Sequence, residues 1–197
     1  MKLCVFQGTF NPIHNAHLAM ARYVRNAYDY ESILFIPAYK PPHKEIDDDL
    51  ANHRFQMVKL AVTGENSFGI SNIEFQNEKF SYTTITIQEL YKRYKIDGKI
   101  GFIIGFDAFR EITEWYEPDT LKELVHFIVF RRNETLDKDR LALLHYKGYK
   151  FSIAEMNPIN ISSTEIREKI AENKSTSGLL PPIVLEYIRE NGLYKNE

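Results

Sequence analysis

Two histidines, His14 and His17, stand three residues apart after the first apolar segment of the chain. In an α/β protein, a helix that begins after a buried strand directs free backbone N–H groups and a partial positive charge towards the crevice where ligands bind. At this spacing both imidazoles would lie on one side of the first helical turn, where their N–H groups suit a triphosphate. Gly8 allows a close approach of the backbone, and Asn11-Pro12 predicts a turn before the helix.

Simpler explanations of the two histidines remain open from the residues alone. A capping turn with two surface histidines binds nothing, and the pair could instead contribute two ligands to a metal site. A zinc site needs a third protein ligand, and the other histidines have no spacing that supplies one. Taken alone, histidines at this spacing favour the structural explanation.

A segment near the other end of the chain combines hydroxyl groups with a cation. Ser162, Ser163 and Thr164 could offer hydroxyls and helix N-terminal amides to a phosphate. Arg167, one turn into the helix, would add positive charge. An ordinary Ser/Thr helix cap explains the three hydroxyl residues as well, when they are considered by themselves.

The elements that must position these residues alternate between strand and helix. Strands are expected where the sequence is apolar or β-rich, at 3–6, 32–36, 100–104, 125–130 and 150–154, with one or two more over 68–75. Helices are expected where apolar residues recur at helical spacing, at 16–28, 50–62, 84–94, 136–145, 164–172 and 183–191. This alternation predicts an α/β fold with a mainly parallel sheet.

Composition and charge narrow the classes of partner. The 197 residues carry a formal net charge of −2, which argues against a general polyanion-binding surface. Basic residues such as Arg131 and Arg132 are therefore more typical of a solvated face than of nucleic-acid binding. The lone cysteine, Cys4, excludes an internal disulfide, and the apolar stretches are far shorter than the roughly 20 residues of a membrane span. With no signal-peptide profile at the N-terminus, we expect a soluble cytoplasmic protein without a membrane partner.

Both phosphate-binding segments match signatures of one superfamily. The run from Gly8 to His17 resembles the first signature of the nucleotidyltransferases, Gly-x-Phe-x-Pro-x-His-x-Gly-His. The run from Ile161 to Arg167 resembles their second signature, Ile-Ser-Ser-Thr-x-Ile-Arg. With this resemblance we expect a Rossmann-like, doubly wound, mainly parallel sheet with helices on both faces and a C-terminal helical segment. One domain should span 1–197, with the segment from about 163 packed on it.

Three shorter segments resemble the bacterial nicotinate mononucleotide adenylyltransferases in particular. They are Pro-Pro-His-Lys at 41–44, Ser-Tyr-Thr at 81–83, and Gly-x-Asp at 105–107 with Trp115-Tyr116 downstream. The resemblance extends from Met1 to about Tyr194, which is essentially the whole chain. Phosphopantetheine adenylyltransferases share the two end signatures, but the first two of these shorter segments are not expected in them.

The resemblance implies that the 5′-phosphate of nicotinate mononucleotide attacks the α-phosphorus of ATP and expels pyrophosphate, a step of NAD biosynthesis. The attacking phosphate is already an anion at neutral pH, so the reaction needs no general base. It needs alignment of two polyanions and neutralisation of the growing charge. Mg²⁺ is the expected cofactor, held mainly by the ATP phosphates, and no metal site made of protein ligands is expected.

The resemblance also assigns roles to residues. The catalytic groups would be His17 at the α-phosphate, His14 beside it, and Lys44 and Arg167 at the β- and γ-phosphates. ATP would bind Gly8, Thr9, Phe10, His14, His17, Gly105, Asp107, Ile161, Ser162, Ser163, Thr164 and Arg167. The mononucleotide would bind Asn11, Lys44, Tyr82, Thr84, Trp115 and Tyr116, with the Trp115 indole stacked on the pyridine ring. Without the resemblance, Lys44 reads as a solvated lysine, Asp107 as a helix N-cap and Trp115 as a core residue.

Three residues depart from the commonest family pattern. Gln7 replaces a glycine, Asn11 an aspartate, and Ala16 the glycine of His-x-Gly-His. Alanine can take the place of that glycine unless the backbone there needs a positive φ. Two alternative functions remain: an adenylyltransferase that accepts nicotinamide mononucleotide, both mononucleotides or phosphopantetheine, and a nucleotide-binding regulatory module without turnover. The resemblance permits a homodimer.

Overall fold

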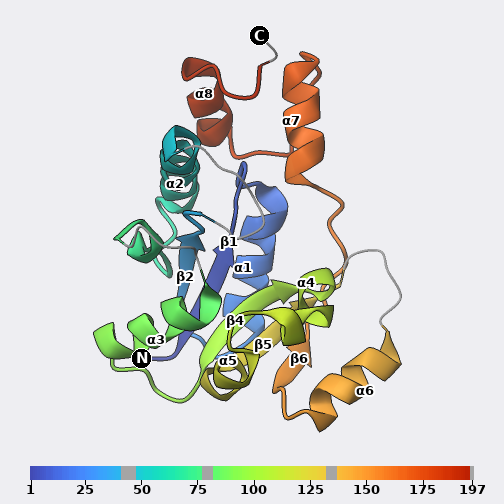
Figure 1. Ribbon diagram of the computed structural model, residues 1–197. Helices are drawn as coiled ribbons and strands as arrows, with labels where there is room; N and C mark the ends of the chain where they lie inside the picture. The colour runs from blue at the N-terminus through green and yellow to red at the C-terminus, as the bar shows by residue number, and fades with distance from the viewer. Residues whose placement is uncertain (41–47, 77–81, 132–136, 196–197) are drawn as a thin grey trace.

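Six parallel strands form a sheet in the order β3-β2-β1-β4-β5-β6 (Figure 1). The computed structural model describes residues 1–40, 48–76, 82–131 and 137–195. The strands are β1 (Leu3–Gly8), β2 (Ser32–Pro37), β3 (Phe68–Ile70), β4 (Ile100–Gly105), β5 (Val125–Phe130) and β6 (Phe151–Ile153). From β1 the chain winds outward to β3, then returns to the other side of β1 and winds outward to β6. This order confirms the predicted doubly wound, Rossmann-like α/β fold, and its switch point between β1 and β4 is where such sheets bind ligands.

The helices expected from apolar spacing are all present, with bounds shifted by one or two residues. They are α1 (Asn15–Ala27), α2 (Asp48–Val62), α3 (Thr83–Arg93), α6 (Lys138–Tyr146), α7 (Ser163–Ala171) and α8 (Pro182–Glu190). Further short helices are η1 (Ile73–Gln76), α4 (Phe106–Arg110), η2 (Ile112–Glu114) and α5 (Pro118–Leu124). The α4 and α5 helices have five and seven residues, too few for a helical period to show in the sequence.

The prediction of one or two strands over 68–75 is right only for its first part. The strand β3 ends at Ile70, and the second part forms the 3-10 helix η1. The backbone N–H of Ile73 donates to Ser71 Oγ at 3.2 Å, and that of Phe75 donates to the Asn72 carbonyl at 2.9 Å. These local bonds turn the chain and replace the strand pairing that the apolar residues suggested.

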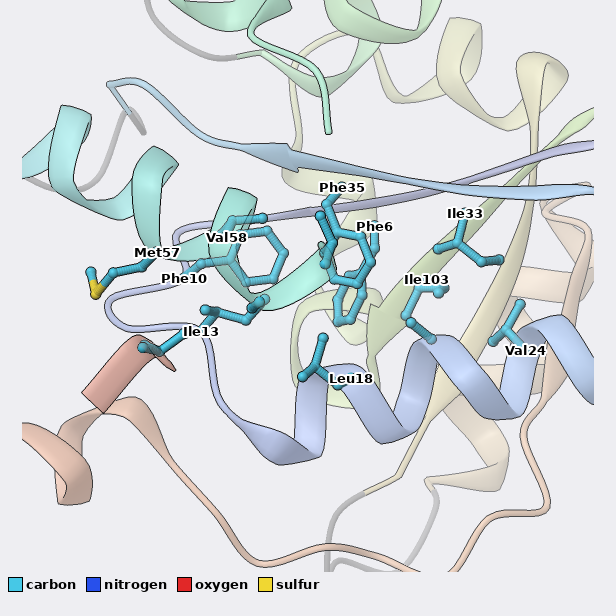
Figure 2. Close-up of a cluster of buried hydrophobic side chains, with 14 of the residues drawn as sticks. Phe6, Phe10, Ile13, Leu18, Val24, Ile33, Phe35, Met57, Val58 and Ile103 are labelled. Atoms are coloured by element: carbon cyan, nitrogen blue, oxygen red, sulfur yellow. The ribbon is translucent and has the colours of Figure 1, made fainter. Parts of the chain in front are cut away.

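The strands present alternate residues to two separate cores, as the period of two in a strand requires. Cys4 and Phe6 of β1 join a cluster covered by α1, α2, α7 and α8, whereas Leu3 and Val5 join one covered by α3, α4, α5 and α6. Figure 2 shows part of the first cluster, with the sheet residues Phe6 and Phe35 facing Leu18 of α1. Helices thus cover both faces of the sheet, as predicted.

The C-terminal helices α7 and α8 lie at the same end of the molecule as the C-terminus of the chain (Figure 1). Ile166 of α7, with Val184 and Ile188 of α8, is buried in the first cluster. The hydroxyl of Tyr187 on α8 hydrogen-bonds His53 Nδ1 on α2 at 2.8 Å. In the four ranges that the structure describes, every helix falls short of the length and apolar character needed to cross a membrane.

Candidate active site

The ring of Phe10 packs into the hydrophobic core and anchors the loop that follows β1. This residue has a φ of 48°, in the left-handed region, and only 3% of it is exposed. Figure 2 shows its ring inside the core beside Val58 of α2. A Cβ on Gly8 would stand 3.1 Å from the Phe10 ring, so the glycine leaves room for that ring. Phe10, assigned to ATP by resemblance, therefore has a clear structural role in shaping the loop.

His14 and His17 form a stacked pair at the start of α1. His14 is the N-cap of the helix and is 4% exposed. The two ring centroids lie 3.6 Å apart with an angle of 17° between the planes. The backbone N–H of His14 donates to His17 Nδ1 at 3.3 Å. Because Nδ1 accepts this bond, a neutral His17 carries its proton on Nε2 and can donate it to a ligand.

A cavity of about 160 Å³ adjoins the two histidines, at the carboxyl ends of β1, β4 and β5. It is lined by Phe6, His14, Ala16, His17, Met20, Gly105, Phe130, Arg131, Met156, Asn157, Pro158, Ile159 and Ile161. Ala16 lies in the first turn of α1 and does not have a positive φ, so the backbone there accepts an alanine. A Cβ on Gly105 would meet no atom of the described residues within 4 Å. Four residues assigned to ATP therefore line this cavity: His14, His17, Gly105 and Ile161.

The second signature meets the loop of the first. Arg167 Nη1 on α7 donates to the Asn11 carbonyl at 2.8 Å, although the two residues are 156 positions apart. Ser163 Oγ donates to the Pro12 carbonyl at 2.9 Å. Ser162 is the N-cap of α7 and its Oγ accepts the N–H of Glu165 at 3.1 Å, so the capping explanation holds alongside any phosphate role. The fold thus joins the two segments that the sequence predicted to share one site.

The residues assigned to the mononucleotide, other than Asn11 and Lys44, form an aromatic group around the start of α3. The rings of Tyr82 and Tyr116 stack with centroids 4.6 Å apart. Thr84 is 1% exposed, and its hydroxyl donates to the Tyr116 carbonyl at 2.7 Å. Trp115 is half-buried and its ring meets Phe102 edge-on at 6.3 Å. In this geometry Thr84 holds the backbone of the aromatic segment, while Tyr116 and Trp115 keep exposed ring surface.

Arg54 on α2 supports the loop that follows β1, and the sequence pattern did not single it out. Its side chain is fully buried, and it donates from Nη1 to the Thr9 carbonyl at 2.6 Å and from Nη2 to the Tyr39 carbonyl at 3.1 Å. Burial lowers its pKa to about 10, so the guanidinium remains charged at neutral pH. One feature of the sequence indicates its burial: Arg54 lies three residues from Ala51 and from Met57, on the side of α2 that is buried.

Glu74 on η1 is a second buried charged residue that the sequence pattern did not single out. It is 4% exposed and accepts hydrogen bonds from the backbone N–H of Tyr39 at 3.2 Å and from Thr86 Oγ1 at 2.9 Å. The side-chain amide of Gln7 also donates to it. Gln7, which departs from the family pattern, is therefore tied to a buried carboxylate beside the site. An acidic residue between Ile73 and Phe75 was the only cue in the sequence.

Lys44, with the whole Pro-Pro-His-Lys segment, lies outside the described residues, as does Ser81. Asp107 is exposed in the first turn of α4, whose N-cap is Gly105, so the helix-cap explanation of Asp107 is wrong. Among the described residues, no group of three His, Cys, Asp or Glu side chains is placed to hold a metal ion.

Comparison with known proteins identifies the family of the chain. Residues 5–169 match the family described as cytidylyltransferase-like. The chain is 41% identical over 201 residues to the probable nicotinate-nucleotide adenylyltransferase of Caldicellulosiruptor saccharolyticus, covering 99% of this chain and 100% of that protein. It is 36% identical over 197 residues to the nicotinate-nucleotide adenylyltransferase of Bacillus subtilis, covering 99% of each.

A solved structure supports the fold. The nicotinic acid mononucleotide adenylyltransferase of Plasmodium falciparum, in complex with NaAD, matches with a TM-score of 0.79 at 20% identity, covering 98% of this chain and 97% of that one. The family itself follows from the full-length matches to the curated relatives. By its sequence, the chain belongs to the cytidylyltransferase-like family and, within it, to the nicotinate-nucleotide adenylyltransferases.

Proposed function

We propose that the protein transfers the adenylyl group of ATP to nicotinate mononucleotide, giving nicotinate adenine dinucleotide and pyrophosphate in NAD biosynthesis. The observation that carries this proposal is the junction of the two signatures. Arg167 and Ser163 bind the carbonyls of Asn11 and Pro12, and this loop leads directly into the stacked histidines. Full-length relatives named nicotinate-nucleotide adenylyltransferase support the choice of substrates.

In the proposed reaction, a phosphate oxygen of the mononucleotide forms a bond to the α-phosphorus of ATP. The bond from the α-phosphorus to the oxygen that bridges the α- and β-phosphates breaks, and pyrophosphate leaves with that oxygen and the electron pair. Both reactants are anions, so the barrier depends on alignment and on donors for the charge that develops. His17 would donate from Nε2 to the α-phosphate, with His14 stacked beside it.

The second signature would hold the leaving phosphates. Arg167 has five N–H donors, of which one is used by the Asn11 carbonyl and one approaches Thr164 Oγ1 at 3.5 Å. The other donors can bind the β- and γ-phosphates, together with Lys44. Because the Ser163 hydroxyl proton is used by Pro12, Ser163 would contribute its backbone N–H at the start of α7.

The cavity next to the histidines would take the adenosine of ATP. Its apolar lining by Met20, Phe130 and Met156 suits the faces of a purine, and Asn157 offers an amide for its edge. Across the site, Trp115 and Tyr116 would take the pyridine ring of the acceptor, with backbone N–H groups reading its carboxylate. We infer that the two aromatic groups of the substrates occupy separate parts of the site.

Mg²⁺ would enter with ATP and be held mainly by phosphate oxygens, where it neutralises part of their charge. The described residues fit an ion of this kind, because Asp107 offers an exposed carboxylate just after the carboxyl end of β4, which suits an ion that keeps several of its waters. Asp107, exposed in the first turn of α4, is the carboxylate that could hold a water of the ion or contact the nucleotide directly.

A pyrophosphate-release assay with ATP and three acceptors in parallel tests the proposed function. We expect the highest kcat/KM with nicotinate mononucleotide, a lower value with nicotinamide mononucleotide and no turnover with phosphopantetheine. A higher kcat/KM with the amide would favour the alternative acceptor. Binding of ATP without pyrophosphate release from any acceptor would favour the regulatory module instead.

The Tyr116→Ala variant is expected to raise KM for nicotinate mononucleotide about three- to tenfold, because a stacked aromatic contact is worth ~0.5–1.5 kcal/mol. KM for ATP should change less than about twofold, since the cavity assigned to adenosine does not include this residue. Steady-state kinetics with each substrate varied in turn measure both values. Tyr146→Ala is the matched control, because that tyrosine is 87% exposed on α6. A larger effect on ATP than on the mononucleotide would reverse the assignment.

Two further proposals concern the cellular location and the oligomeric state of the enzyme. We propose a cytoplasmic location, where ATP is available as the adenylyl donor, and fractionation of the host cells would check it. We also propose that a homodimer, which the family resemblance permits, forms in solution. Light scattering on the purified protein would distinguish it from a monomer.

A further inference from the structure

The end of the chain returns to the loop of the first signature. The hydroxyl of Tyr194 donates to Asn11 Oδ1 at 2.6 Å, across 183 positions in the sequence. Leu193 and Tyr194 pack against the core cluster under α1 and α2. Tyr194 has a φ of 63°, an uncommon conformation for a bulky residue, which its ring packing and hydroxyl bond must offset.

This bond differs in kind from the other contacts that hold the loop. Three backbone carbonyls of the loop are bound by side chains: Thr9 by Arg54 at 2.6 Å, Asn11 by Arg167 at 2.8 Å and Pro12 by Ser163 at 2.9 Å. Those contacts determine where the backbone lies. Tyr194 instead binds a side chain of the loop, and so determines which way the Asn11 amide faces.

The orientation of the Asn11 amide leaves its Nδ2 available as a hydrogen-bond donor at the site. With Oδ1 bound to Tyr194, the two N–H groups on Asn11 Nδ2 point away from the tyrosine. Within the part of the chain that the structure describes, Nδ2 has no hydrogen-bond partner. Burial raises the pKa of Tyr194, against the charges of Arg167 and Arg54, so the hydroxyl remains protonated and continues to act as the donor.

We propose that Tyr194 is a positioning residue, which turns the Asn11 amide so that Nδ2 donates to the phosphate of the mononucleotide. This inference rests on the proposed function, which supplies that acceptor. Asn11 does not line the cavity assigned to adenosine, whereas His14, Ala16 and His17 further along the loop and helix do. The donor therefore belongs to the part of the loop that faces the second substrate. A donor that is already oriented binds without first losing side-chain freedom.

The test compares two tyrosine hydroxyls in the C-terminal segment. Tyr194→Phe removes the bond to Asn11, and Tyr187→Phe removes the bond to His53 that joins α8 to α2 without contacting the loop. We expect Tyr194→Phe to raise the Kd and KM for nicotinate mononucleotide about fivefold, the effect of one lost hydrogen bond. KM for ATP should change less than about twofold. Tyr187→Phe should lower Tm without changing either value.

A double-mutant cycle with Asn11→Ala tests the route of the effect. Asn11→Ala should raise the Kd for nicotinate mononucleotide at least as much as Tyr194→Phe, and the second substitution should add nothing in that background. Equal effects of the two tyrosine variants, or an undiminished effect of Tyr194→Phe without Asn11, would overturn the proposal. So would wild-type affinity in Asn11→Ala, even if Tyr194→Phe failed to fold.

Calorimetry separates this inference from the proposed function, because it measures mononucleotide binding without turnover. If the wild type binds nicotinate mononucleotide but releases no pyrophosphate, the proposed function fails and the Kd values still decide the role of Tyr194. If the wild type does not bind nicotinate mononucleotide, both proposals fail.

Discussion

Replacing His17 with alanine is expected to lower kcat about a hundred- to a thousandfold, the loss typical of removing one donor to a developing oxyanion. His17 Nδ1 accepts the backbone N–H of His14, and in the proposed mechanism Nε2 donates to the α-phosphate. Because the charge grows in the transition state, KM for ATP should change less than about threefold. Pyrophosphate release measured over a range of both substrates gives the two parameters.

His145→Ala is the matched control for this prediction, since His145 lies exposed on α6, which covers the other face of the sheet. It should leave kcat unchanged. The stacked rings of His14 and His17 also predict that His14→Ala and His17→Ala are not additive. An unchanged kcat in His17→Ala would remove His17 from its proposed role.

Replacing Arg54 with methionine is expected to lower the free energy of unfolding by about 2–4 kcal/mol, because it removes a buried guanidinium that donates to two part-buried carbonyls. These are the carbonyls of Thr9 and Tyr39. For a chain of this size, Tm should fall by about 5–15 °C. The loop that leads to His14 would lose its contact with α2, so kcat/KM should fall as well.

Thermal unfolding monitored by circular dichroism measures this effect. Arg25→Met is the control, because Arg25 is exposed in the last turn of α1, and its Tm should change by less than about 2 °C. Arg54→Lys keeps the positive charge but not the planar guanidinium that binds both carbonyls. Its Tm should therefore lie between those of the wild type and Arg54→Met. A wild-type Tm in Arg54→Met would show that the buried bonds do not hold the loop.

The structure accommodates each of the three residues that depart from the family pattern. Gln7 donates to the buried carboxylate of Glu74. Ala16 lies in a regular helical turn, where a side chain is tolerated. Asn11 is bound through its backbone by Arg167 and through its side chain by Tyr194. None of the three disrupts the junction of the two signatures.

Much of the fold could be predicted because its signals are local. The run Ile100–Ile104 is apolar throughout and Val125–Phe130 is apolar apart from His126, as expected for strands buried on both faces, and the long helices carry an apolar period. Residues 73–76 could not be assigned in the same way. Their apolar residues are equally compatible with a strand, and the hydrogen bond to Ser71 decided for a 3-10 turn.

The sequence by itself determined most of the strands, the long helices and the two nucleotidyltransferase signatures, because periodicity and motif spacing are properties of neighbouring residues. Only the tertiary structure decided which distant groups meet. It placed Arg167 on the Asn11 carbonyl across 156 positions and Tyr194 on the Asn11 amide across 183. It also made Arg54 a buried anchor of the loop. Such pairings depend on how loops and helices from distant parts of the chain pack together, and local sequence patterns do not specify these side-chain partners.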